Sequence, residues 1–218
     1  VSEPMSCCRE GGYCDRCDLL VDLPGLRVVV VERDARDRLV VTVESPPGPM
    51  GCPSCGVVAV GHGRDAVELV DAPAFGRPVR IVWRKRRWLC PDPGCPVGSF
   101  VEQDERVAAP RSRLTARACW WAIGQIGREH ASVNGLRRQL GCGWRTVWET
   151  IKPLLQEAAA DPSRFEGVTR LGVDEHIWHH GDPRRKGPKE LTGMVDLTRD
   201  EDGRVHARLL DLVPGRSK

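Results

Sequence analysis

Four cysteines arranged in two short turns are the residues of this sequence best suited to chemistry. Cys52 and Cys55 lie in the sequence CPSCG, and Cys90 and Cys95 lie in CPDPGC. Each turn can direct two thiolates at one ion, and a hairpin between the turns would bring the two pairs together. This spacing predicts a zinc ribbon with tetrahedral Cys₄ coordination, in which the zinc is structural because no position remains for water or substrate. Four separately buried cysteines are the alternative, which the pairing disfavours.

The other six cysteines are weaker candidates for metal binding. Four of them lie in a Gly-containing leader that has no strands to support a second site, so we expect residues 1–18 to be disordered. Cys119 and Cys142 fall in helical surroundings, where cysteine acts as a small core residue. The leader cysteines are Cys7, Cys8, Cys14 and Cys17.

Composition places the chain among ordinary globular proteins. It has 218 residues, of which 40% are hydrophobic and 29% are charged, and its net charge is +3, which suggests one or two domains. No run approaches the roughly 18 apolar residues that a membrane span needs, and the N-terminus lacks the apolar stretch of a signal peptide. We therefore expect a cytoplasmic protein without a membrane partner, in which thiols stay reduced and bind metal or pack in a core.

Strands and turns fill the sequence around the zinc-binding cysteines. Two β-branched runs, residues 26–34 and 38–45, form a predicted hairpin, and prolines end it before the first cysteine turn. Residues 67–70 and 79–89 are two further predicted strands, and they lie between the cysteine turns. Together these elements predict a β-rich zinc-binding module over residues 19–105.

The strand that leads into the second cysteine turn is basic. Residues 80–88 read RIVWRKRRW, which places cations and two tryptophans beside the metal. Such a strand suits DNA phosphates, with binding that weakens steeply as salt rises. A solvated edge strand that uses charge to resist aggregation is the alternative. The DNA-contacting residues predicted here are Arg80, Arg84, Lys85, Arg86 and Arg87.

A helical segment is predicted over residues 110–160. After Pro110 the apolar residues follow the helical period, and Thr115 is placed to cap the first helix. Residues 132–139 and 144–152, with a glycine-containing turn between them, have the proportions of a helix-turn-helix.

The two helices of this motif would share a core and leave one face for DNA. The second helix would present Trp144, Arg145 and Thr146 outward, and these are types of side chain that reach base edges and phosphates. A plain two-helix corner looks similar in sequence, but the basic zinc module that precedes the motif favours DNA binding. The expected core residues are Leu136, Leu140, Val147 and Ile151.

A carboxylate embedded in a strand is a second candidate for metal chemistry. Asp174 lies in TRLGVDEH, residues 169–176, and we expect it to be buried. In ribonuclease H-like nucleases, a carboxylate on the first, central strand holds Mg²⁺ for phosphoryl transfer. One alternative is an acid at a strand end that accepts backbone hydrogen bonds. Another is a transition-metal site with His176, His179 and His180, which the alternation of side chains along a strand disfavours.

Three strands are predicted after the helices. They cover residues 168–177, 190–197 and 205–213, with Gly-, Pro- and charge-rich turns between them. Asp196, on the second of these strands, is expected to support Asp174 rather than to join it.

Taken in order, these segments resemble insertion-sequence transposases of the ISL-three family. The resemblance covers nearly everything from about Leu19 onward, and the combined order is more specific than any single motif. It implies a DNA-binding half that recognises terminal inverted repeats, followed by a ribonuclease H-like domain that cuts and joins DNA by two-metal phosphoryl transfer. The matching segments are LPGLRVVVVERD (residues 23–34), CPSCG (52–56), RKRRWLCPDPGC (84–95), LGVDEHIW (171–178), MVDLT (194–198) and LLDLVPGRSK (209–218).

The same resemblance implies roles for residues and partners. Asp174 matches the first acid of the family's DDE triad and would bind catalytic Mg²⁺. The partners would be double-stranded DNA, at the element ends and at the target, and further copies of the protein in a homo-oligomer. The other two acids are expected beyond Lys218, so these residues alone are expected to bind DNA without cutting it.

The predicted fold class is α+β. It comprises the β-rich zinc-ribbon module, the helical helix-turn-helix segment and, over residues 166–218, the first three strands of an incomplete ribonuclease H-like α/β domain. A transcription regulator built from a zinc ribbon and a helix-turn-helix is the alternative function. A small metal hydrolase is disfavoured because too few ligands share one face of a strand.

Overall fold

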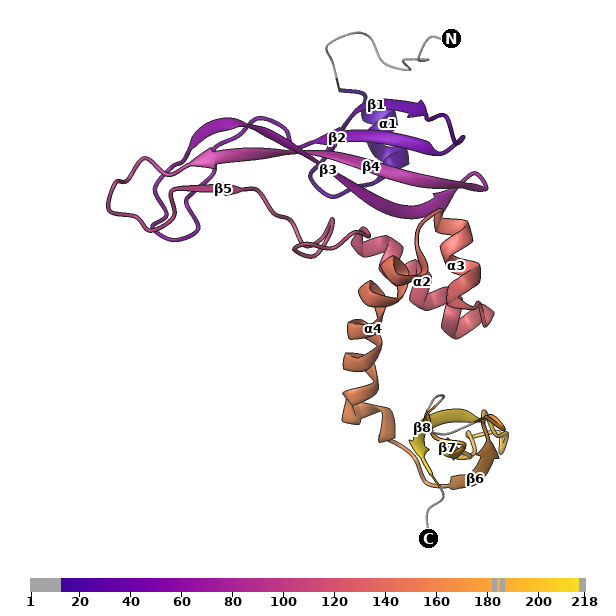
Figure 1. Cartoon of the computed structure of the whole chain (residues 1–218). Helices are drawn as coiled ribbons and strands as arrows, with labels where there is room; N and C mark the ends of the chain where they lie inside the picture. The colour runs from indigo at the N-terminus through magenta and orange to yellow at the C-terminus, as the bar shows by residue number, and fades with distance from the viewer. Residues whose placement is uncertain (1–12, 182–183, 185–186, 216–218) are drawn as a thin grey trace. The chain divides into compact units, whose positions relative to one another are not determined.

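The structure, a computed structural model, describes residues 13–181, 184 and 187–215. Four α-helices and two β-sheets make up its regular structure over these residues, so the predicted mixed α+β class is confirmed. The chain divides into two compact units, Val1–Leu155 and Gln156–Lys218, each of which holds one sheet (Figure 1). The leader cysteines Cys7 and Cys8 lie outside the described residues.

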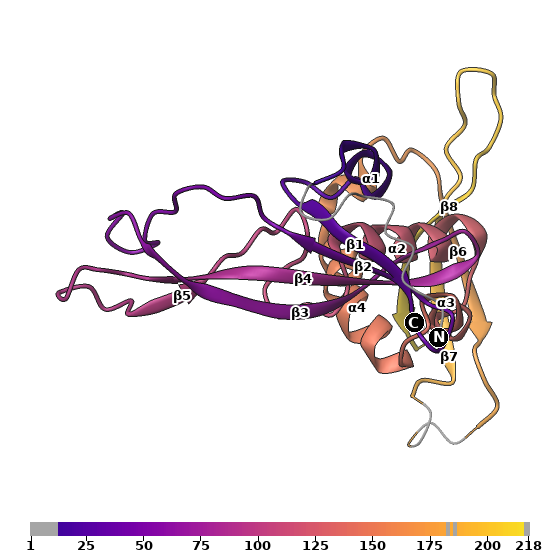
Figure 2. The same cartoon turned by 90° about the horizontal axis from the view of Figure 1, so that it is seen from above.

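The sheet of the first unit is built around one long hairpin. Its strands are arranged in the order β1-β2-β4-β3, and the short strand β5 pairs with the far end of β4. β3 and β4 run past the ends of β1 and β2, as Figures 1 and 2 show. The strands are β1 (Arg27–Arg33), β2 (Leu39–Glu44), β3 (Val60–Ala74), β4 (Arg77–Leu89) and β5 (Ser99–Val101).

Local sequence explains the two hairpins of this sheet. β1 and β2 come from the β-branched runs and pair antiparallel. β3 and β4 are joined at Phe75 and Gly76, whose φ angles of 52° and 71° are both positive, as a two-residue type I′ turn requires. β2 and β4 pair in parallel, with Val43 beside Trp83. Trp83 and its fully buried neighbours Val43 and Ile81 form the centre of the core on one face of the sheet.

A short helix precedes the sheet where a disordered leader was expected. Helix α1 (Asp15–Val21) ends at Asp22. The carboxylate of Asp18 accepts hydrogen bonds from the backbone N–H of Val28 at 2.6 Å and from Arg27 at 2.7 Å. These bonds attach the helix to β1, so the expected irregular leader does not extend to residue 18.

Three helices follow the sheet. They are α2 (Ala116–Glu129), α3 (Val133–Leu140) and α4 (Trp144–Ala160). Thr115 caps α2 by accepting a hydrogen bond from the backbone N–H of Ala118 at 3.2 Å, as its position in the sequence predicted. Ser132 caps α3 in the same way, and Gly141, with φ of 60°, ends it.

The helices share one hydrophobic core, which is attached to the sheet. Leu136, Leu140, Val147 and Ile151 are all fully buried in it, as the sequence predicted. β3 joins this cluster through Val70, whose backbone exchanges hydrogen bonds with Arg113 and Thr115 at 2.8 and 2.9 Å.

A buried carboxylate reinforces the junction between β3 and α2. Asp71 accepts a hydrogen bond from the hydroxyl of Thr115 at 2.6 Å and forms an ion pair with Arg117. Arg117 also donates to the backbone carbonyls of Val21, the last residue of α1, and of Asp22, which follows it. One buried acid therefore connects α1, β3 and α2.

The second unit contains a three-stranded antiparallel sheet in the order β6-β7-β8. The short 3-10 helix η1 (Pro162–Phe165) precedes it, and Arg164 pairs with Asp211 of the last strand at 3.3 Å. The strands are β6 (Leu171–Ile177), β7 (Glu190–Asp196) and β8 (Arg208–Pro214).

Replacing Asp71 with alanine is expected to lower the free energy of unfolding by about 3 kcal/mol, because Arg117 and the buried hydroxyl of Thr115 lose their acceptor. Urea denaturation followed by tryptophan fluorescence measures the change. Asp65→Ala, on the exposed part of the same strand, is the control and should change the stability little. Equal losses in the two variants would contradict the role assigned to Asp71.

Candidate zinc centre and nucleic-acid interface

The two cysteine turns meet at the far end of the β3–β4 hairpin. Their four Sγ atoms all lie within 4.8 Å of one another. The Sγ atoms of Cys52 and Cys95 are 3.7 Å apart, and those of Cys55 and Cys90 are 3.6 Å apart. A tetrahedron with Zn–S bonds of about 2.3 Å has edges of about 3.8 Å. The quartet therefore fits a structural zinc.

Backbone geometry prepares the first turn for metal binding. The N–H of Cys52 donates to Val57 at 2.8 Å, and Gly56, with φ of 74°, closes the turn by donating to the carbonyl of Cys52 at 2.9 Å. The N–H groups of Cys55 and Ser54 lower the pKa of Cys52 to about 7. This thiol is thus already inclined toward the thiolate form that zinc requires.

The second turn is shaped by Asp92. Its side chain accepts a hydrogen bond from Gly94 at 2.9 Å, and its carbonyl accepts one from Cys95 at 3.2 Å. The backbone N–H of Asp92 lowers the pKa of Cys90, but burial and the neighbouring thiols outweigh it and raise this pKa to about 12. A bound divalent cation would instead lower the pKa of Cys90, because the cation attracts the thiolate form.

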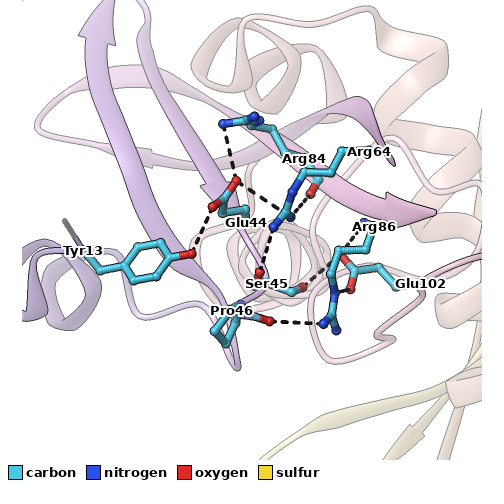
Figure 3. A network of polar contacts seen from close by, with 8 residues as sticks. All are labelled: Tyr13, Glu44, Ser45, Pro46, Arg64, Arg84, Arg86 and Glu102. Carbon is cyan, nitrogen blue, oxygen red and sulfur yellow. Dashed lines mark hydrogen bonds and ion pairs between the residues drawn. The ribbon is translucent and has the colours of Figure 1, made fainter. Parts of the chain in front are cut away.

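A buried carboxylate holds the loop that delivers the first cysteine turn (Figure 3). Glu102, which follows β5, accepts hydrogen bonds from the hydroxyl of Ser45 at 2.9 Å and from Arg86 Nε at 2.7 Å. Arg86 also donates to the backbone carbonyls of Pro46 and Gly48, both at 3.1 Å. The proline-rich loop is therefore attached to β4 and to the segment after the second turn.

Glu44 is a second node of this network (Figure 3). Its carboxylate accepts a hydrogen bond from the hydroxyl of Tyr13 at 3.0 Å. It also pairs with Arg84 at 3.4 Å and with Arg64 at 3.7 Å. Because Arg64 in turn donates to the carbonyl of Arg84 at 3.1 Å, these contacts join the end of β2 to β3 and β4.

The sequence predicted that Arg80 contacts DNA, but the structure places this residue in the interior. Only 3% of the residue is exposed, and its guanidinium donates to the carbonyls of Leu140 at 3.0 Å and Gly141 at 2.5 Å. Its Nε pairs with Glu68 at 3.2 Å. Val79 and its alternate neighbours point into the sheet core, so Arg80 points to the opposite face, which α2 and α3 cover. Arg80 therefore fixes the turn between α3 and α4.

The other cations of β4 fall into two groups. Arg86 is committed to Glu102 inside the loop network. Arg84, Lys85 and Arg87 stay partly accessible, although each has a partner. Arg87 pairs with Asp65 at 3.5 Å, and Lys85 donates to Gln103 at 2.6 Å. The alternative of an edge strand is wrong for β4, since it lies between β2 and β3 and then between β3 and β5.

The first turn of α4 carries the three predicted DNA contacts. Arg145 is prominent, with 85% of its side chain exposed and an ion pair to Glu149 at 3.2 Å. Trp144 is 47% exposed and lies with its ring centroid 5.9 Å from that of Trp148. Thr146 is half-buried. Val147, which follows them, is fully buried in the core, so the side chains of this turn that reach solvent are those of Trp144 and Arg145.

The structure corrects the expectation that Asp174 is buried. Asp174 is exposed and accepts a hydrogen bond from the backbone N–H of Glu175 at 2.9 Å. The physical reason is that little packs on either face of β6, most of whose residues are solvent-exposed. This arrangement leaves the carboxylate available but does not itself form a metal site.

Neither Asp196 nor the histidines join Asp174. Asp196 pairs in register with Leu171, whereas Asp174 pairs with Gly193. Hydrogen bonds from Thr198, and then from Arg208, lower the pKa of Asp196. Over residues 13–181, 184 and 187–215, the only group of three or more possible metal ligands is the cysteine quartet. No metal site therefore forms around His176, His179 and His180 in the part of the chain described.

Sequence reasoning missed the acids that position the site. Asp71 lies in LVDAP and Glu102 in SFVEQ. The available signal for Asp71 was the one applied to Asp174, a single acid within a largely apolar strand. Nothing in the local sequence marks Glu102, because its partners lie on distant segments.

Residues 48–95 match the family model described as the zinc-finger of transposase IS204/IS1001/IS1096/IS1165. The matched segment contains both cysteine turns and the β3–β4 hairpin between them. The predicted zinc ribbon is thus confirmed, and this part of the chain is similar to the zinc finger of transposases of the ISL-three type. No curated protein and no solved structure matches the chain. Among the described residues, no helix is long and apolar enough to cross a membrane.

One zinc ion per chain is expected by elemental analysis of the purified protein. Cys90→Ser should abolish zinc retention and unfold the ribbon, because the free energy of metal binding is folding free energy in such a site. Cys142→Ser, outside the quartet, is the matched control and should keep its zinc. Full zinc content in Cys90→Ser would contradict the assignment of the zinc to this quartet.

Glu102→Ala is expected to destabilise the protein by about 3 kcal/mol, since Arg86 would be left largely buried without its carboxylate. Urea denaturation monitors stability, and elemental analysis monitors zinc. Glu105→Ala, an exposed acid three residues further on, serves as the control and should behave like the unmodified protein. Identical denaturation midpoints for the two variants would show that Glu102 does not hold the loop.

Proposed function

We propose that this chain forms the N-terminal region of an insertion-sequence transposase, in which the zinc ribbon and the helix-turn-helix bind duplex DNA together. The observation that carries the proposal is the match of residues 48–95 to a transposase zinc finger. Its support in the structure is the quartet of thiols whose sulfur atoms all lie within 4.8 Å of one another, close enough to bind one zinc ion. The zinc is structural, and the DNA-binding surface is built by the elements that it holds.

The geometry of α3 and α4 supports the helix-turn-helix part of the proposal. The two helices share a buried core, and a glycine in the left-handed region makes the turn between them. Arg80 fastens that turn to β4 through the carbonyls of Leu140 and Gly141. The ribbon and the helices of the first unit would therefore meet DNA as one body, with Arg145 and its neighbours at the major groove.

Arg84, Lys85 and Arg87 are the cations of β4 that we assign to the phosphate backbone. They remain partly accessible, whereas Arg80 and Arg86 are used inside the protein. Their present partners include the partly exposed Asp65, whose ion pair with Arg87 is weak enough for a phosphate to replace it. Such contacts would fix the register of the protein on DNA without reading its sequence.

For the complete transposase we propose DNA cutting and joining with Asp174 as the first acid of a Mg²⁺-binding DDE triad. In ribonuclease H-like nucleases this acid lies on a central strand, and a further strand beside the open edge of β6 would make β6 central. The other two carboxylates must come from outside the described residues, in which no acid cluster surrounds Asp174. A homo-oligomer acting on paired element ends is part of the same proposal.

Selection from fragmented genomic DNA of the source organism tests the proposed function. The zinc-loaded chain should enrich terminal inverted repeats that flank its own gene. Arg145→Ala should weaken binding to the enriched sequence by about 10- to 100-fold, the effect of removing one base-reading side chain, whereas Arg16→Ala should bind normally. Enrichment of intergenic operator sites would point to a transcription regulator instead, and recovery of no DNA would overturn DNA binding.

A further inference from the structure

A cavity of about 680 Å³ lies between α4 and the connection that links β5 to α2. Its floor is apolar and includes the buried residues Leu114 and Cys119. One wall is formed by α4, from Arg145 to Leu154, and residues 109–113 form the other. Trp120, at the start of α2, also lines the cavity and is 63% exposed.

The wall opposite α4 is held in place by the sheet. The carbonyl of Arg113 accepts a hydrogen bond from the backbone N–H of Val70 at 2.8 Å. Ser112 donates from its hydroxyl to Leu114 at 2.7 Å and from its N–H to Ala109 at 3.0 Å. Arg111 has φ of 62°, a conformation that costs free energy for a residue other than glycine and persists only where its surroundings impose it. The loop is therefore held in a defined conformation.

The charges around the cavity favour an anionic partner. Arg111, Arg113 and Arg145 are all exposed and line it. The two carboxylates in the lining are Glu105 and Glu149, and Glu149 is already paired with Arg145 at 3.2 Å. This ion pair is exposed and therefore weak, so a phosphate can compete with Glu149 for Arg145.

The proposed function identifies this anion as the backbone of duplex DNA. Arg145 and Thr146, which we assign to the major groove, line the same cavity as Arg111 and Arg113. A duplex that meets the first turn of α4 must therefore come within reach of the opposite wall. The exposed indole of Trp120 can pack against deoxyribose and donate its N–H to a phosphate.

We infer that residues 109–113 and Trp120 form a second DNA-contacting element, which holds the sugar–phosphate backbone beside the groove that α4 enters. The inference rests on the proposed function, because it needs DNA at α4. It assigns two tasks to two walls: α4 reads sequence, while Arg111 and Arg113 add affinity that does not depend on sequence.

The salt dependence of DNA affinity tests this division. Fluorescence anisotropy would measure the Kd of the whole zinc-loaded chain for a random-sequence duplex across a range of salt concentrations. In the double variant Arg111→Gln/Arg113→Gln, the slope of log affinity against log salt should fall by about 2, because each neutralised phosphate contributes roughly 0.9 to that slope. Trp120→Ala should weaken binding several-fold with little change in slope.

Two further double variants keep the test specific. Arg16→Gln/Arg36→Gln removes the same charge from exposed positions that do not line the cavity, and its salt slope should match that of the unmodified chain. Arg111→Lys/Arg113→Lys retains the charge and should retain the slope. Zinc content and thermal unfolding should be the same in all variants.

The possible failures are distinguishable. If the unmodified chain binds DNA and the loop variant has the slope of the Arg16→Gln/Arg36→Gln control, the second DNA-contacting element is wrong and the proposed function stands. The inference is also wrong if the Lys variant shows the same reduced slope as the Gln variant, because charge would then not be the cause. If the unmodified chain binds no duplex, both proposals fall.

Discussion

The first unit depends on the closeness of two cysteine turns that lie far apart in the sequence. Sulfur atoms with Sγ–Sγ distances of 3.6 and 3.7 Å cannot stay together as thiolates without a cation, since like charges at that distance repel strongly. The antiparallel register of β3 and β4 brings Val60 opposite Leu89 and so delivers the turns to the same place. Metal binding and hairpin pairing thus support each other. The position of neither cysteine turn is specified by local sequence alone.

Buried charges determine how the pieces of this unit are joined. Asp71, Arg80 and Glu102 are each buried and each bonded to a segment distant in the sequence. Taking such groups out of water is costly, so their net contribution to stability is small even where removal of one partner is damaging. We infer that these charges serve mainly to fix the positions of the elements they join, because a displaced element would leave a buried charge without its partner. They favour one arrangement of α1, the ribbon and the helices.

Sequence patterns predicted the helices and strands better than they predicted which of these elements pack or pair with one another. The β-branched runs, the capping residue Thr115 and the core of α3 and α4 could be predicted locally, because each depends on neighbours within a few positions. The parallel pairing of β2 with β4 could not, since it joins segments with no local signal. The first half of β3 was also missed: GHGRD has little β propensity, and its conformation comes from pairing with β4.

The same dependence on distant segments explains why the exposure predicted from sequence was wrong for two charged residues, Arg80 and Asp174. Arg80 and Arg84 lie on one strand and looked equivalent in RIVWRKRRW, but α3 covers the sheet at Arg80 and does not extend along the whole strand. Asp71 and Asp174 looked alike as single acids in strands, but only Asp71 is covered by a helix. Exposure is decided by what packs on a strand. Arg80, on the part of β4 that α3 covers, becomes an anchor, whereas Arg84, beyond that part, stays exposed and available for a partner.

This distinction bears on how the ribbon and α4 would act together. Arg80 connects the carbonyls at the end of α3 to the strand that continues to the second cysteine turn. Gly141 allows that approach, since a Cβ there would lie 2.9 Å from the ring of Pro78. The start of α4 is therefore located by β4 as well as by its own core. A DNA duplex that contacts Arg145 and the accessible cations of β4 would meet a surface whose spacing is fixed before binding, so less conformational entropy is lost when the complex forms.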